Sequence, residues 1–238
     1  MRARLRFPRL WCAPALLLLY QAAPRPFVDE VGRLRLALGV TRGGYRDEEF
    51  DCAGNLTRSS PVRYHSVSGQ AEAWLGAKLR LAGAVGRFGG SSDSLLDLRT
   101  ATFGSVILAY EGAKLGLGGG VAHWPERFGG SGPIPALYLR IGRVDKMHFR
   151  VDENASAAPG MPPGYRVGIG SGYGPSRETR WFLGLNAYPF GNNDGVSFGG
   201  ELGLPLRAPV QPMLQAALGS KSQWTLGVGL SATIGQPR

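Results

Sequence analysis

Apolar and polar residues alternate one by one along most of this chain. In 32–41, every second residue from position 34 onward is Leu or Val, and the residues between them are Arg, Ala, Gly and Thr. The same pattern returns in 224–235, where Trp, Leu, Val and Ile alternate with Thr, Gly and Ser. A period of two is typical of a β-strand with one apolar face and one polar or small face. Since helical periodicity is absent beyond the first segment, the pattern predicts an all-β fold.

The alternation predicts twelve strands, with ten as the lower bound for the number. The predicted strands are 32–41, 64–75, 77–88, 97–110, 113–123, 135–142, 147–152, 165–173, 180–188, 196–204, 210–219 and 223–235.

The connections between these strands alternate in length. Tight or short connections are predicted at 76, 111–112, 143–146, 174–179 and 205–209, and longer ones at 42–63, 89–96, 124–134, 153–164 and 189–195. The short connection 220–222 is the exception among the second set. Such alternation predicts a single antiparallel up-and-down β-barrel with two different ends, and with both ends of the barrel domain on the short-turn side.

Glycine accounts for 37 of the 238 residues, against an ordinary usage of ~7%. This content argues against a helical bundle, and no apolar run approaches the ~18 residues of a membrane-spanning helix. The glycines gather on the polar faces, as at Gly116, Gly118 and Gly120. Small residues suit a crowded barrel interior, whereas a surface in water would carry Lys and Glu.

The amino end predicts export through the Sec pathway. Residues 1–23 combine four arginines, a short apolar core over 13–20 and a small residue at the end, as in a secretory signal peptide. Removing them lowers the formal net charge from +10 to +6, which is 23 basic minus 17 acidic residues. The remaining 24–238 form the predicted barrel domain. It has no run of Lys and Arg, so no nucleic-acid partner is predicted.

Several large aromatic residues stand near predicted strand ends: Tyr110, Trp124, Trp181, Tyr188 and Trp224. Together with the alternation and the small polar faces, they make residues 28–235 resemble a bacterial outer-membrane β-barrel protein. The resemblance is architectural. It implies an outer-membrane location, the lipid bilayer as partner, short periplasmic turns and longer outer loops. A secreted soluble barrel, with the apolar face inward, is the alternative.

The phase of the strands assigns a set of charged residues to the barrel lumen. The predicted lumen-lining residues are Arg33, Arg35, Glu72, Lys78, Arg80, Arg99, Lys114, Arg140, Arg150, Arg166 and Glu201. Glu111 and Asp152 share the inward phase, so nine basic residues face four acidic ones. Either these charges pair and plug the lumen, or the surplus of arginine lines a pore that favours small anionic solutes. The predicted function is a passive pore or solute-binding barrel with a basic lumen.

No catalytic motif, cofactor site or metal site is predicted. His65 stands beside Ser66, but adjacent strand residues point to opposite faces, so the two cannot pair simply. The acidic cluster over 47–51 lacks the spacing of an EF-hand and predicts a solvated loop. An outer-membrane lipid-modifying enzyme and a structural barrel that conducts nothing are the alternative functions.

Overall fold

The computed structural model describes residues 33–76, 78–92, 100–124, 133–144, 146–153, 164–172, 179–190, 193–204, 210–220 and 222–234. The predicted signal peptide, 1–23, and Arg99 lie outside the described residues. Within the described ranges, no helix has the length and apolar character needed to cross a membrane.

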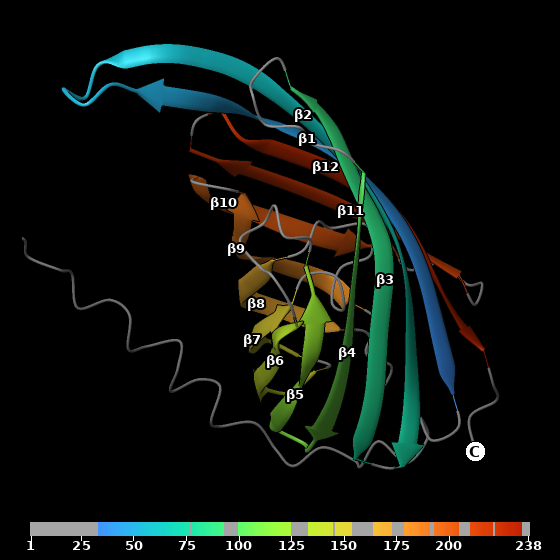
Figure 1. The fold of residues 1–238 in the computed structure, drawn as a ribbon. Helices are drawn as coiled ribbons and strands as arrows, with labels where there is room; N and C mark the ends of the chain where they lie inside the picture. The colour runs from blue at the N-terminus through green and yellow to red at the C-terminus, as the bar shows by residue number, and fades with distance from the viewer. Residues whose placement is uncertain are drawn as a thin grey trace, which may run out of the picture.

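Twelve antiparallel strands form one closed barrel, in which each strand pairs with its neighbours in the sequence and β1 pairs with β12 (Figure 1). The strands are β1 (Leu34–Phe50), β2 (Leu56–Gly76), β3 (Leu79–Ser92), β4 (Ala101–Glu111), β5 (Leu115–His123), β6 (Pro133–Gly142), β7 (His148–Glu153), β8 (Tyr165–Gly172), β9 (Thr179–Phe190), β10 (Asn193–Gly203), β11 (Val210–Gly219) and β12 (Trp224–Ile234). The predicted up-and-down barrel of twelve strands is confirmed.

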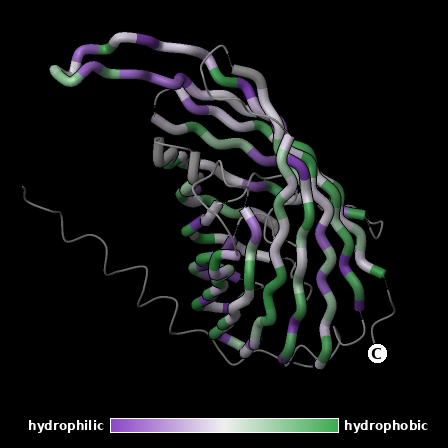
Figure 2. Tube along the Cα trace, in the orientation of Figure 1, coloured by the Kyte–Doolittle hydropathy of each residue, from purple (hydrophilic) through white to green (hydrophobic). Residues whose placement is uncertain are grey.

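The apolar face of the wall points outward. Leu38 on β1 and Leu218 on β11 are 70% and 71% exposed, whereas the polar Ser66 and Thr225 are each 1% exposed. Figure 2 shows hydrophobic and hydrophilic positions alternating along the strands of the wall. An apolar exterior around a polar interior is the architecture of outer-membrane barrels, so the resemblance seen in the sequence is confirmed. A soluble barrel needs the opposite arrangement.

Large inward side chains lie across from glycine on the neighbouring strand. Phe103 pairs in register with Gly86, and Tyr64 pairs with Gly43. A Cβ atom at Gly86 would lie 2.5 Å from the Phe103 ring, and one at Gly43 would collide with the Tyr64 ring. The inward glycines therefore supply the space that the aromatic rings fill.

The predicted outer loop 42–63 is wrong over most of its length. β1 continues to Phe50 and β2 begins at Leu56, so the two strands form a hairpin that extends beyond its neighbours (Figure 1). Asp51 closes its turn by accepting hydrogen bonds from the amides of Ala53 and Asn55 at 2.9 and 2.8 Å. Inward and outward positions still alternate in this hairpin, so the strands continue. Its outward residues include polar ones such as Arg42, Arg46 and Arg63, in place of the leucines and valines of the wall.

The predicted long connection 189–195 is also wrong. β9 extends to Phe190 and β10 begins at Asn193, which leaves only residues 191–192 between them. Phe190 and Asn193 pair in the β9–β10 register, so the described strands continue almost to each other. The content of Gly, Asn and Asp marked a turn in the sequence, but it did not reveal how short that turn is.

We expect Gly86→Ala to destabilise the barrel by about 1–3 kcal/mol, because the new methyl group meets the Phe103 ring. The matched control is Gly83→Ala on the same strand, where the nearest atom to a Cβ is the Ser105 carbonyl oxygen at 3.4 Å. Urea unfolding of the folded barrel in detergent measures both. Equal effects of the two substitutions would contradict the described packing.

Candidate functional site: an ionic network inside the barrel

One cluster of ion pairs joins strands β2, β3, β4 and β6 across the interior. Arg80 lies between two carboxylates, with Nη1 3.1 Å from Glu72 Oε2 and Nε 3.1 Å from Glu111 Oε1. The second oxygen of Glu111 lies 3.2 Å from Arg140 Nη2. Arg140 and Glu111 are both 0% exposed. The cluster thus pairs two arginines with two carboxylates.

The ion pair between Arg140 and Glu111 spans β5, which lies between their strands. This reach is possible because β5 places Gly116 opposite Glu111, where a Cβ atom would collide with the carboxylate. Arg140 also donates hydrogen bonds to the carbonyl oxygens of Gly112, at 2.8 Å, and Gly142. Gly112 lies in the turn between β4 and β5, and Gly142 is the last residue of β6, so Arg140 ties the barrel interior to its short turns.

A second cluster joins β7, β8 and β10. Asp152 Oδ2 forms an ion pair with Arg150 Nε at 2.6 Å, and Asp152 Oδ1 accepts a hydrogen bond from Arg166 Nε at 2.7 Å. Arg166 Nη1 lies 2.6 Å from Glu201 Oε2. The ring of Phe182 on β9 packs against both guanidinium groups, with centroid distances of 5.0 Å to Arg150 and 4.4 Å to Arg166.

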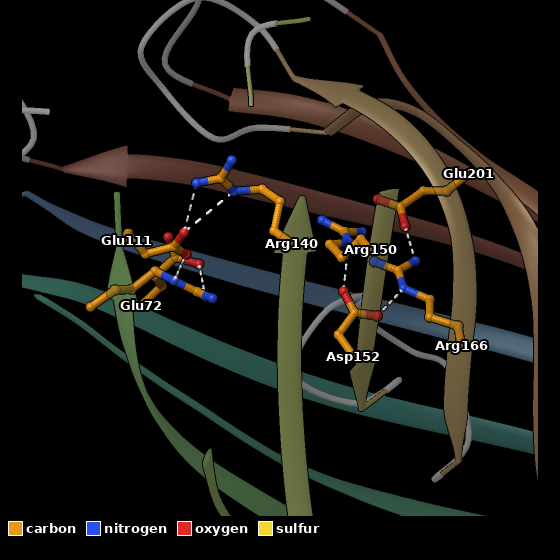
Figure 3. A network of polar contacts seen from close by, with 8 residues as sticks. Glu72, Glu111, Arg140, Arg150, Asp152, Arg166 and Glu201 are labelled. Carbon is orange, nitrogen blue, oxygen red and sulfur yellow. Dashed lines mark hydrogen bonds and ion pairs between the residues drawn. The ribbon is translucent and has the colours of Figure 1, made fainter. Parts of the chain in front are cut away.

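The two clusters meet where Arg140 stands opposite Arg150 in the β6–β7 register. Figure 3 shows the two clusters side by side, and we call them together the ionic network. The ionic network comprises Glu72, Arg80, Glu111, Arg140, Arg150, Asp152, Arg166 and Glu201. Four arginines face four carboxylates, so its formal charges cancel. In a poorly hydrated interior, such pairing is what permits these groups to stay charged.

The remaining predicted lumen residues lie elsewhere. Arg33 and Arg35 are half-buried at the start of β1, and Arg35 stands opposite Glu72 in the β1–β2 register. Lys78 and Lys114 are exposed and lie in the turns before β3 and β5, not on the strands where the sequence placed them. Turn residues are not bound by the alternation of a strand, so phase gave no guide to their direction.

The end of the barrel that carries the short turns, which we call the turn end, is narrowed by a contact across the lumen. Trp74, on the last part of β2, packs against Val144 in the turn between β6 and β7. His148, beside this turn, is buried, and its Nδ1 lies 3.2 Å from the carbonyl oxygen of Arg143. This end therefore closes on side chains from opposite parts of the wall.

Polar groups also line the interior away from the ionic network. The buried hydroxyls of Ser66, Ser105, Ser197 and Ser231, on β2, β4, β10 and β12, have no hydrogen-bond partner in the described part of the chain. Buried hydroxyls of this kind are ordinarily satisfied by water. One arc of the interior is therefore suited to holding water.

The histidine beside a serine forms no catalytic pair. His65 is exposed on the outward face of β2, whereas Ser66 is buried on the inward face. His123 is exposed at the end of β5. Over the ranges that the structure describes, no three His, Cys, Asp or Glu side chains gather in a way that could hold a metal ion. Asp47, from the predicted acidic loop, instead points inward from β1 and is buried.

No family model and no curated protein matches this chain. Among solved structures, it is similar to an outer membrane channel from Pseudomonas putida F1, with 12% identity, a TM-score of 0.49, and coverage of 90% of this chain and 98% of that one. It is also similar to a Pseudomonas aeruginosa FadL homologue, with 7% identity, a TM-score of 0.34, and coverage of 84% and 89%. With both TM-scores below 0.5, the fold and the site rest on this chain's own register and contacts.

We expect Arg166→Met to destabilise the barrel by about 3–5 kcal/mol, because Asp152 and Glu201 then lose their shared partner inside the wall. Replacing the whole second cluster, with Met at Arg150 and Arg166 and Leu at the two carboxylates, should cost far less. Urea unfolding in detergent compares the two variants. A larger loss for the fourfold variant would show that the charges themselves stabilise the fold.

Proposed function

We propose that this protein is an outer-membrane channel for small solutes whose lumen is held closed by the ionic network. The observation that carries the proposal is the combination of an exposed apolar wall with a row of buried, paired charges inside it. An apolar exterior of this extent is stable against lipid but unfavourable in water. The turn end, where β1 begins and β12 ends, then lies in the periplasm.

The charges inside the wall support a channel over a purely structural barrel. An apolar filling of the same volume is commonly as stable as a buried ion-pair network, so packing alone does not call for one. Ionisable groups within a membrane protein typically mark a path for ions or polar solutes. The interior hydroxyls of Ser66, Ser105, Ser197 and Ser231 supply polar contacts along such a path.

The solute preference rests on Arg33 and Arg35 at the turn end. The ionic network adds no net charge, because its arginines and carboxylates are equal in number. Arg35 stands opposite the neutral Thr233 on β12 and opposite Glu72 on β2, and Glu72 already pairs with Arg80. Arginine side chains at a narrow mouth attract anions and repel cations, so we propose small anions as the solutes.

A structural barrel that never conducts is the second candidate. The full burial of Arg140 and Glu111 favours it, as does the contact between Trp74 and Val144 at the turn end. In this case the ionic network only fills the lumen.

Conductance in a planar bilayer separates the two candidates. We expect the wild-type protein to open rarely, and Glu111→Ala with Asp152→Ala to open often, because these carboxylates each join two arginines. Lys78→Gln, which changes an exposed turn residue outside the network, is the control and should behave as wild type. If every variant stays silent while heat-shifted gel mobility shows a folded barrel, the structural candidate holds.

Ion selectivity, measured in the conducting variant Glu111→Ala with Asp152→Ala, tests the proposed class of solute. Arg33→Gln with Arg35→Gln should lower the preference for chloride over potassium, read from the reversal potential in a salt gradient. When Arg33 and Arg35 are kept, high salt should weaken the preference for chloride over potassium, because mobile ions screen the fixed charge. Lys78→Gln with Lys114→Gln carries the same charge change on exposed turns and should shift the potential less. An unchanged potential in the arginine variant would set the anion proposal aside.

A further inference from the structure

A group of basic side chains projects outward from the wall, away from the lumen. Arg42 on β1, Arg63 and His65 on β2, and Arg87 on β3 are all exposed on the outward face. We call these four residues the basic patch. Arg42 stands opposite His65 in the β1–β2 register, and Arg87 stands opposite Val67, the next outward residue of β2. Three neighbouring strands thus bring the patch together.

The basic patch lies directly beyond the apolar band. On each of its strands, the next outward residue toward the turn end is a valine: Val40 on β1, Val67 on β2 and Val85 on β3. Trp224 on β12 stands opposite Gly44, near the patch, and tryptophan is typical of the membrane interface. The patch is therefore placed where the outer leaflet has its headgroups.

The wall below the patch is hollowed on its outer side. One apolar groove of about 1100 Å³ runs over β1, β2, β3, β11 and β12, and Arg87 stands on its rim. A second groove of about 860 Å³ has Arg42 on its rim. Val40, Leu214 and Val228 belong to both grooves, so the two adjoin. A continuous apolar hollow with arginines at its edge matches a molecule with apolar chains and an anionic head.

The charge of the patch is not balanced by the nearby wall. Among the residues that the structure describes, Arg42, Arg63 and Arg87 have no ion-pair partner, whereas each inward arginine of the ionic network pairs with a carboxylate. Cationic side chains on a lipid-facing wall are unfavourable unless they reach the interface or meet an anion. Three such residues side by side call for an anionic partner in the membrane.

We propose that the basic patch and the hollow below it bind a phosphorylated lipid of the outer leaflet, with its acyl chains in the grooves and its phosphate on the arginines. Arginine suits this role because its planar guanidinium group can donate two parallel hydrogen bonds to one phosphate. The inference rests on the proposed outer-membrane location. It adds a lipid site on the outer face that is separate from the lumen and its solutes.

Native mass spectrometry of the full barrel in detergent tests this site, with hexa-acylated lipid A carrying two phosphates as the probe. Replacing Arg42, Arg63 and Arg87 together by Gln should lower the bound fraction at least about tenfold, since each basic group near an anionic lipid contributes to binding. The same three changes to Lys should lower binding less than the changes to Gln, because the positive charge stays while the paired hydrogen bonds are lost. The control replaces the turn lysines Lys78, Lys114 and Lys146 by Gln and should retain binding.

The lipid itself supplies a test that is independent of folding in the variants. Wild-type protein should lose binding when both phosphates are removed from the lipid, and a large excess of inorganic phosphate should not displace the intact lipid. Equal binding of the dephosphorylated lipid, or of the glutamine variant, overturns the inference. Insertion into vesicles, read by heat-shifted gel mobility, is measured separately. Failure to insert contradicts the outer-membrane proposal, whereas insertion without lipid binding contradicts this inference alone.

Discussion

The structure depends on one constraint: a closed barrel with its apolar face outward must place its charged side chains in a crowded interior. Charges in such a place persist only when they are paired. Two arginines of the ionic network meet this demand twice. Arg80 lies between Glu72 and Glu111, and Arg166 lies between Asp152 and Glu201. The interior is therefore organised around shared partners, with no reserve of free positive charge in the network.

Glycine makes this arrangement possible. A residue with a side chain in place of Gly116 would occupy the position of the Glu111 carboxylate, which Arg140 reaches from beyond β5. Gly86 leaves room for the Phe103 ring in the same way. The high glycine content is thus a packing requirement, because long inward side chains on some strands need short ones opposite. Because Gly116 has no side chain, the ion pair between Arg140 and Glu111 can form across the intervening strand β5.

Alternation along the chain was enough to predict the strands, their number and the two faces, because strand residues alternate between faces wherever the strand lies. Alternation did not predict the positions of the turns or the lengths of the hairpins. The content of Gly, Pro, Asn, Asp and Ser in 42–63 predicts a loop, yet β1 and β2 remain paired over most of this segment. The ionic network was out of reach for a related reason. Which carboxylate pairs with Arg140 depends on the registers of β4, β5 and β6. The sequence of a single strand does not determine these registers.

The most direct test is the accessibility of spin labels placed one at a time along β12, from Thr225 to Ser231, in a Cys52→Ser background reconstituted in lipid. We predict high collision with oxygen at the outward positions Leu226, Val228 and Leu230, and little contact with either oxygen or a water-soluble nickel reagent at Thr225 and Ser231. High nickel contact at the inward positions would show an open, water-filled lumen. High nickel contact at Leu226, Val228 and Leu230 would show that the apolar face is not in a membrane, and would contradict the account as a whole.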